Sequence, residues 1–149
     1  ISPAQEHFIS NLIRQKIIVA IDGQVNQAQY NKKYILYLPE NELHEITLLF
    51  SSYLIKSRNN KVIYLGQNVP HEDLVNIYLD HNPDFILTVL TSNPTQDQIQ
   101  AHIYKLSESF KNSTILVSGH QVVGQGLDFP DNVFLLNKLQ DLIDLIDSQ

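Results

Sequence analysis

The chain has 149 residues, enough for one domain with a buried core, and its 10 Lys and Arg against 16 Asp and Glu give a formal net charge of −6. The basic residues are scattered, which excludes the basic stripe that a direct nucleic-acid surface needs to neutralise phosphates. The absence of cysteine excludes disulfides and thiolate metal sites, and no apolar run approaches the roughly 20 residues of a membrane span. We therefore expect a cytoplasmic protein that does not contact a membrane.

The first 30 residues are predicted to form one amphipathic helix followed by a polar linker. Ser2 is placed to cap the helix, Pro3 suits its first turn, and Gln5 completes a capping box. An apolar stripe continues to about Ile21 and contains Phe8, Ile9, Leu12, Ile13 and Ile17. No partner for this stripe occurs within the same segment. We interpret residues 1–30 as the last helix of a helical bundle plus a linker, and we expect other bundle helices or a second subunit to cover the stripe.

From residue 33 onward, strand and helix patterns alternate. The strand-like runs are Tyr34–Leu38, Val62–Leu65, Phe85–Leu90, Ile115–Val117 and Val133–Leu136. The helical patterns lie at about 45–58, 71–81, 96–111 and 138–147. Repeated strand–helix units with short connections predict a parallel sheet covered by helices on both faces. Residues 31–149 are therefore predicted to form a flavodoxin-like (Rossmann-like) α/β domain with five strands.

The turn after the first strand contains a carboxylate and an imidazole, Glu42 and His44. Open α/β sheets bind their ligands beside the loops at the carboxyl ends of the strands. From such a turn, His44 can reach a cofactor or a metal, and Glu42 can orient the imidazole. A structural alternative is that His44 bonds only to Glu42 or to solvent, and that Glu42 caps the helix that begins near Glu45.

The sequence of this turn excludes several common sites. It lacks the G-x-G-x-x-G pattern of dinucleotide folds, and Leu48 stands where a zinc-protease helix needs its second histidine. The end of the first strand also lacks the clustered acidic residues that hold magnesium in receiver domains. His71, His81, His102 and His120 have no metal-site spacing and are interpreted as surface or loop histidines. What remains is a sizeable, neutral ligand reached by one imidazole.

Several segments of the chain resemble the motifs of a known family. The run Glu42-Leu43-His44-Glu45-Ile46-Thr47 resembles the E/D-x-H-x-x-G motif of cobalamin-binding domains. Thr88-Val89-Leu90 stands where that family has S-x-L, and Ser118-Gly119 stands where it has G-G. The segment from Val62 to Pro70, which contains Gly66, resembles the second-strand region of the light-responsive, cobalamin-dependent repressors of the MerR family.

The resemblance implies a cobalamin site. His44 would be the lower axial ligand of cobalt, and adenosylcobalamin or methylcobalamin would be the cofactor. Glu42, Thr47, Gly66, Thr88, Leu90, Ser118 and Gly119 would belong to the cofactor site. Glu6 and His7 resemble the E-H pair on the last bundle helix of these repressors, which lies over the upper face of the corrin.

The resemblance also implies a regulator rather than an enzyme. DNA would be bound only through an N-terminal helix-turn-helix segment that is not present here, and cobalamin would control the assembly of a homo-oligomer. Thr47 and Ser118 stand where the family has glycine, which favours an alternative: a cofactor-free domain that serves in dimerisation or partner binding. A third hypothesis is a cobalamin carrier domain of a methyltransferase or mutase, although these residues supply no substrate site.

Overall fold

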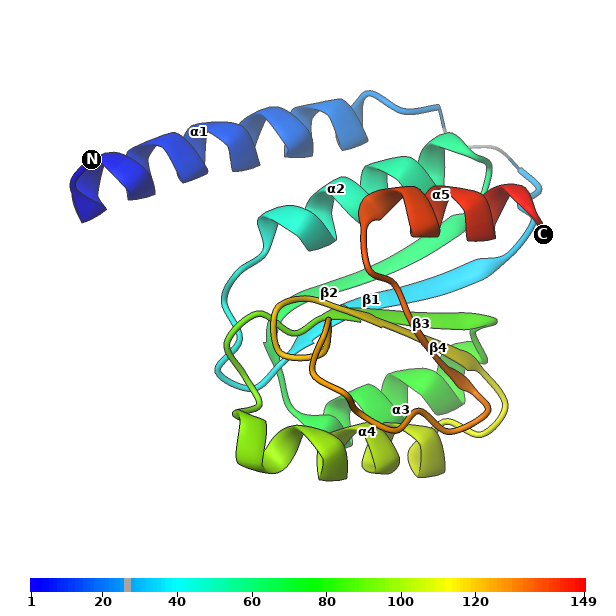
Figure 1. The fold of residues 1–149 in the computed structure, drawn as a ribbon. Helices are drawn as coiled ribbons and strands as arrows, with labels where there is room; N and C mark the ends of the chain where they lie inside the picture. The colour runs from blue at the N-terminus through cyan, green and yellow to red at the C-terminus, as the bar shows by residue number, and fades with distance from the viewer. Residues whose placement is uncertain (26–27) are drawn as a thin grey trace.

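A parallel sheet of five strands forms the centre of the computed structural model, which describes residues 1–25 and 28–149 (Figure 1). Its strand order is β2-β1-β3-β4-β5, and every neighbouring pair is parallel. The strands are β1 (Lys33–Pro39), β2 (Lys61–Val69), β3 (Phe85–Val89), β4 (Thr114–Ser118) and β5 (Val133–Leu135). The predicted five-stranded α/β fold is therefore confirmed.

Two helices cover each face of this sheet. One face carries α2 (Ile46–Ser57) and α5 (Leu139–Asp147), and the other carries α3 (His71–His81) and α4 (Gln96–Ser109). Alternate side chains of β1 point to opposite faces: Ile35 and Tyr37 pack with α3 and α4, whereas Leu36 and Leu38 pack with α2. Because both faces are covered, the inner strands β1 and β3 are apolar along nearly their whole length, as doubly covered parallel strands must be.

The first helix, α1 (Pro3–Asp22), lies outside α2 as an additional layer (Figure 1). The predicted capping box is present: the Gln5 amide donates to the Ser2 hydroxyl, and the Ser2 amide donates to the Gln5 side chain. No described residue of α1 is buried, and most of the predicted stripe is exposed. Among residues 1–25 and 28–149, no helix is long and apolar enough to cross a lipid bilayer.

The second strand differs from its prediction. It continues to Val69, so Gly66 lies inside β2 and not in a loop that follows it. The pairing of β1 with β2 shifts register beside Gly66, whose φ is +78°. A bulge of this kind prolongs a strand past a glycine that the sequence pattern alone marks as a turn.

Candidate functional site

The carboxylate of Glu42 is fully buried and accepts an unusual number of backbone hydrogen bonds. Its Oε1 accepts from the amides of Thr91, Ser92 and Asn93 at 2.7, 2.6 and 3.3 Å. These three residues form the loop after β3, which lies beside β1 in the sheet. The loop thus turns successive N–H groups toward one carboxylate oxygen, as in the anion-binding concavities built from backbone amides.

The second oxygen of Glu42 fixes the turn after β1. Oε2 accepts from the Leu43 amide at 3.0 Å and from the His44 amide at 3.2 Å, and it lies 2.8 Å from Nδ1 of the His44 ring. These partners precede α2, which begins at Ile46 without a side-chain cap. The interpretation of Glu42 as a helix cap is therefore wrong.

These hydrogen bonds decide the charge of Glu42. Burial acts to raise its pKa, but hydrogen bonds from the Ser92 amide, from the side chain and amide of His44, and from the Asn93 amide outweigh that effect, so the pKa is lowered. Glu42 is accordingly a carboxylate at neutral pH and can only accept hydrogen bonds. The hydrogen between it and His44 must then be carried by Nδ1.

The His44 ring is consequently oriented for coordination. Nδ1 is held by Glu42, whereas the side chain is 63% exposed, and Nε2 makes no hydrogen bond within the described part of the chain. A carboxylate that accepts the Nδ1 hydrogen fixes the tautomer that has a free lone pair on Nε2. This is the arrangement that a single imidazole ligand of a metal requires.

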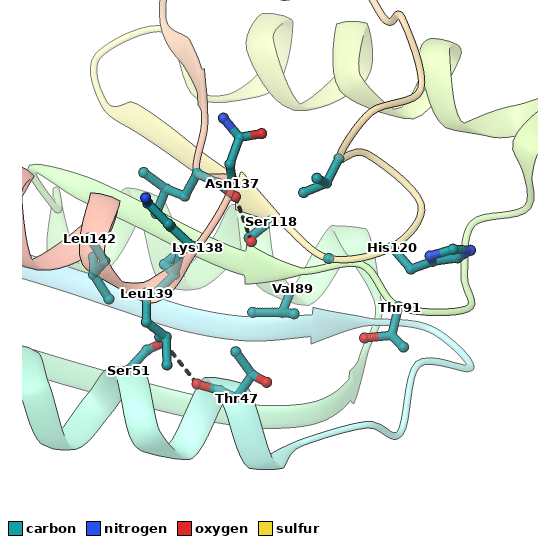
Figure 2. Close-up of a pocket in the computed structure, with 14 residues that line it drawn as sticks. Thr47, Ser51, Val89, Thr91, Ser118, His120, Asn137, Lys138, Leu139 and Leu142 are labelled. Atoms are coloured by element: carbon teal, nitrogen blue, oxygen red, sulfur yellow. Dashed lines mark hydrogen bonds between the residues drawn. The ribbon is translucent and has the colours of Figure 1, made fainter.

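A cavity of about 440 Å³ opens close to this turn (Figure 2). It lies among the start of α2, the carboxyl ends of β3 and β4, and the segment that leads into α5. Its walls combine apolar side chains with hydroxyls, an amide, an imidazole and an ammonium group. The lining residues are Thr47, Ser51, Leu87, Val89, Thr91, Ser118, Gly119, His120, Val123, Leu136, Asn137, Lys138, Leu139 and Leu142.

Three of the residues predicted from the sequence line this cavity: Thr47, Ser118 and Gly119. The Ser118 hydroxyl donates to the backbone carbonyl of Leu136 at 2.7 Å (Figure 2). The side chain that replaces the family's glycine is therefore hydrogen-bonded within the cavity wall. Gly119 has φ +105°, and a Cβ there would lie 2.5 Å from the Leu90 carbonyl oxygen. Position 119 thus requires glycine, because the backbones of residues 119 and 90 approach each other too closely for a Cβ atom.

Two other predicted residues, Thr88 and Leu90, lie outside the cavity. Both are buried, and Leu90 packs in the core cluster on the α3 and α4 side of the sheet. From β3 and the residues after it, Val89 and Thr91 line the cavity instead. The alternation of a strand predicts that Val89 and Thr91 share a face, but not which helices cover that face. The sequence therefore offered no signal that would single them out.

Gly66 lies behind the His44 turn and not on the cavity. A Cβ at this position would lie 3.2 Å from Glu45 Oε2 and 3.5 Å from the Tyr64 ring. Glu45 is 6% exposed, accepts the Tyr64 hydroxyl at 3.0 Å and pairs with Arg14 Nε at 2.9 Å. Gly66 thus leaves room for the buried carboxylate that anchors α1.

The contact between Arg14 and Glu45 also determines where Glu6 and His7 lie. A second contact, from the Gln24 side chain to the Tyr53 carbonyl at 2.9 Å, shows that α1 and α2 run in the same direction. The residues before Arg14 therefore extend past the start of α2, on the side where the loops follow the strands (Figure 1). His7 lies two turns before Arg14 on the same face, about 10 Å along the helix axis. Both Glu6 and His7 are exposed.

No family model matches the chain. Over 95 residues it is 30% identical to the HTH-type transcriptional repressor CarH of Myxococcus xanthus. The match covers 63% of this chain and 31% of the repressor, so the chain spans less than a third of that relative. The chain is a partial homologue of a transcriptional repressor, and this relative is not an enzyme.

Three solved structures with a similar fold are cobalamin proteins. The methanol:cobalamin methyltransferase complex MtaBC of Methanosarcina barkeri matches with a TM-score of 0.68 and 12% identity, over 99% of this chain and 57% of that one. The monomethylamine corrinoid protein of the same organism matches with a TM-score of 0.64 and 14% identity, over 95% and 67%. A cobalamin-binding protein of Desulfitobacterium hafniense DCB-2 matches with a TM-score of 0.61 and 17% identity, over 79% and 58%. The α/β fold of this chain is that of cobalamin-binding domains.

Proposed function

We propose that this chain is the cobalamin-binding sensory part of a MerR-type transcriptional regulator, with His44 as the lower axial ligand of cobalt. The observation that carries the proposal is the buried Glu42 carboxylate, which holds Nδ1 of an otherwise exposed imidazole. The homology to a transcriptional repressor supports regulation, and the fold supports the cofactor.

The residues at this edge of the sheet fit the cofactor. A bound cobalamin supplies a cobalt ion that accepts one imidazole nitrogen and carries an exchangeable upper ligand. Nε2 of His44 is the nitrogen available, and Glu42 keeps the ring in the required tautomer. The cavity beside Thr47 would take the displaced base and its nucleotide tail, with Ser118 and Gly119 in its wall.

The remaining predicted residues would act around this centre. Glu6 and His7, on the overhanging end of α1, would face the upper ligand. Thr88 and Leu90 lie behind the wall, so they would shape the cavity through the backbone of β3 and the residues after it. Gly66 would contribute indirectly, because it leaves room for the Glu45 carboxylate that anchors α1.

The regulatory output would be a change of assembly. In this proposal, binding at His44 and at the overhanging end of α1 favours one arrangement of the bundle, and so one homo-oligomer, over another. DNA would be bound by a separate helix-turn-helix segment, in the cytoplasm. The exposed apolar residues Phe8, Leu12 and Ile13 of α1 supply a surface for such association.

The proposal is tested by visible-spectrum titrations with hydroxocobalamin and adenosylcobalamin. We expect wild type to shift the cobalamin spectrum through the new imidazole ligand, and His44→Ala to lose that shift together with at least tenfold in affinity. His81→Ala, at the far end of α3, is the matched control and should behave as wild type. An unchanged spectrum with wild type would refute the cofactor and leave the cofactor-free dimerisation module, which sedimentation would then test.

A further inference from the structure

A second cavity, of about 310 Å³, opens on the opposite face of the sheet. It lies between the start of α3 and the side of α4 that carries Gln98, His102 and Lys105, and it shares no lining residue with the cavity beside Thr47. Its walls include Tyr37 of β1, His71 at the start of α3, and His102 and Lys105 of α4. The cavity is therefore a separate feature of the same edge of the sheet.

Two polar atoms in these walls have no hydrogen-bond partner within the described residues: the Tyr37 hydroxyl and Nε2 of His102. Tyr37 is 2% exposed, and the neighbouring Thr88 hydroxyl is likewise buried and without a partner. Buried polar groups in folded proteins nearly always have partners, because leaving one unpaired is costly. Tyr37 and Thr88 are paired across β1 and β3, and their hydroxyls act on each other. Nε2 of His102 is therefore the atom that most clearly points to a polar group that this cavity receives.

Tyr37 and Lys105 supply hydrogen-bond donors to this cavity. Burial raises the pKa of Tyr37, the nearby Thr88 hydroxyl only partly offsets this, and the phenol therefore keeps its hydrogen at every physiological pH. Lys105 adds an ammonium group, and Glu40 is the single carboxylate among the lining residues, at an exposed position. Pro94 and Gln98 also line the cavity, so the first turn of α4 lies beside it.

The two histidines are neutral when the cavity holds no anion. Burial, then the nearby His71, then Lys105 lower the pKa of His102 to about 4. Burial and Lys105 lower the pKa of His71 as well, against the opposing effect of Glu72. A negative group placed beside His102 would raise its pKa again, so that Nε2 becomes a donor and a proton is taken up with the ligand.

We propose that this cavity binds a small oxyanion, the phosphate or carboxylate group of a metabolite, through the Tyr37 hydroxyl, Nε2 of His102 and the Lys105 ammonium group. An oxyanion supplies several acceptor lone pairs and a negative charge, which match the two neutral groups and the one cation in these walls. The proposed anion site does not depend on His44 or on cobalamin. An experiment can therefore refute anion binding without refuting the proposed function, and the reverse.

The test is a titration of the whole chain with inorganic phosphate and, in parallel, with acetate. Imidazole NMR signals report on each histidine, and calorimetry in two buffers of different ionisation enthalpy reports on proton uptake. We expect the His102 signals to move to the protonated position, and the affinity to rise as the pH falls, by up to about tenfold per unit. Preference for phosphate or for acetate identifies the group that the site accepts.

Two variants and one control make the test decisive. Tyr37→Phe removes one donor and should weaken binding about threefold to tenfold. His102→Gln should abolish the linked proton uptake. His81→Gln, at the other end of α3, should bind as wild type. The proposal is overturned if neither anion moves the His102 signals, or if Tyr37→Phe and His102→Gln bind as the control does.

Discussion

At the scale of single residues, the candidate site depends on one buried charge. Glu42 accepts five backbone N–H groups, of Leu43, His44, Thr91, Ser92 and Asn93, and the His44 ring. A buried carboxylate is tolerable only when it is this fully hydrogen-bonded. The same contacts that satisfy Glu42 join the loops after β1 and β3 and orient the imidazole.

We predict that Glu42→Gln lowers the free energy of unfolding by about 1–3 kcal/mol at pH 7, because the amide presents donors to amide donors. Glu40→Gln changes an exposed carboxylate two residues away and should cost less than about 0.5 kcal/mol. Urea unfolding of both variants measures the difference. Equal stabilities for the two variants would contradict the network.

The pH dependence of stability gives a second test of Glu42. Its folded-state pKa is lowered, so its contribution is fully present above the ordinary glutamate value of 4.5 and is lost as the pH falls from there through the folded pKa. Wild type should therefore lose stability below about pH 4.5, and Glu42→Gln should lose less over the same range. The measurement is urea unfolding at a series of acidic pH values. Parallel curves for the two proteins would show that Glu42 titrates normally.

At the scale of elements, α1 is attached by few polar contacts and no buried residue. Its anchor is Arg14, which is 45% exposed, on the buried carboxylate of Glu45. Helices held in this way belong to the low-stability part of a protein. A helix of low local stability can change position when a ligand binds. This property of α1 suits the proposed sensor, in which α1 covers the ligand.

We predict that Arg14→Ala increases hydrogen exchange of the α1 amides about fivefold, which corresponds to roughly 1 kcal/mol for a partly exposed charged hydrogen bond. The amides of α2 to α5 should keep their protection. Arg58→Ala breaks the more exposed pair with Asp147 and is the matched control. Unchanged exchange in α1 would show that the helix is held by other contacts.

At the scale of the whole molecule, one sheet edge carries both candidate sites, because the carboxyl ends of parallel strands meet there. Each core cluster of buried side chains, one per face of the sheet, lies between residues 34 and 146. The first helix contributes none of these buried residues. The boundary near residue 30 stays a prediction, in which the α/β domain would fold without the first helix.

We predict that residues 31–149 alone fold with a melting temperature within a few degrees of the whole chain, since a loss of about 1 kcal/mol shifts a domain of this size by that much. Thermal unfolding followed by circular dichroism measures it. A fragment without a cooperative transition would show that α1 is part of the α/β domain.

The sequence alone determined the elements and the pairing of Glu42 with His44. Helix and strand periodicities are local, and the observed ends of most elements lie within two or three residues of those expected. Glu42 and His44 are two residues apart, so a single turn brings them together. Gly66 shows the limit of local patterns, because the bulge that keeps it inside β2 depends on pairing with β1.

Only the tertiary structure decided which side chains share a cavity. The contacts of Glu42 with residues 91–93 join positions about fifty apart in the chain, which no local pattern encodes. The sequence predicts His102 at the surface, yet it is half-buried, because α4 turns that face toward the start of α3. Likewise, alternation along β3 groups Val89 with Thr91 and Thr88 with Leu90, but only the packing of α2 and α5 against one face assigns the first pair to the cavity.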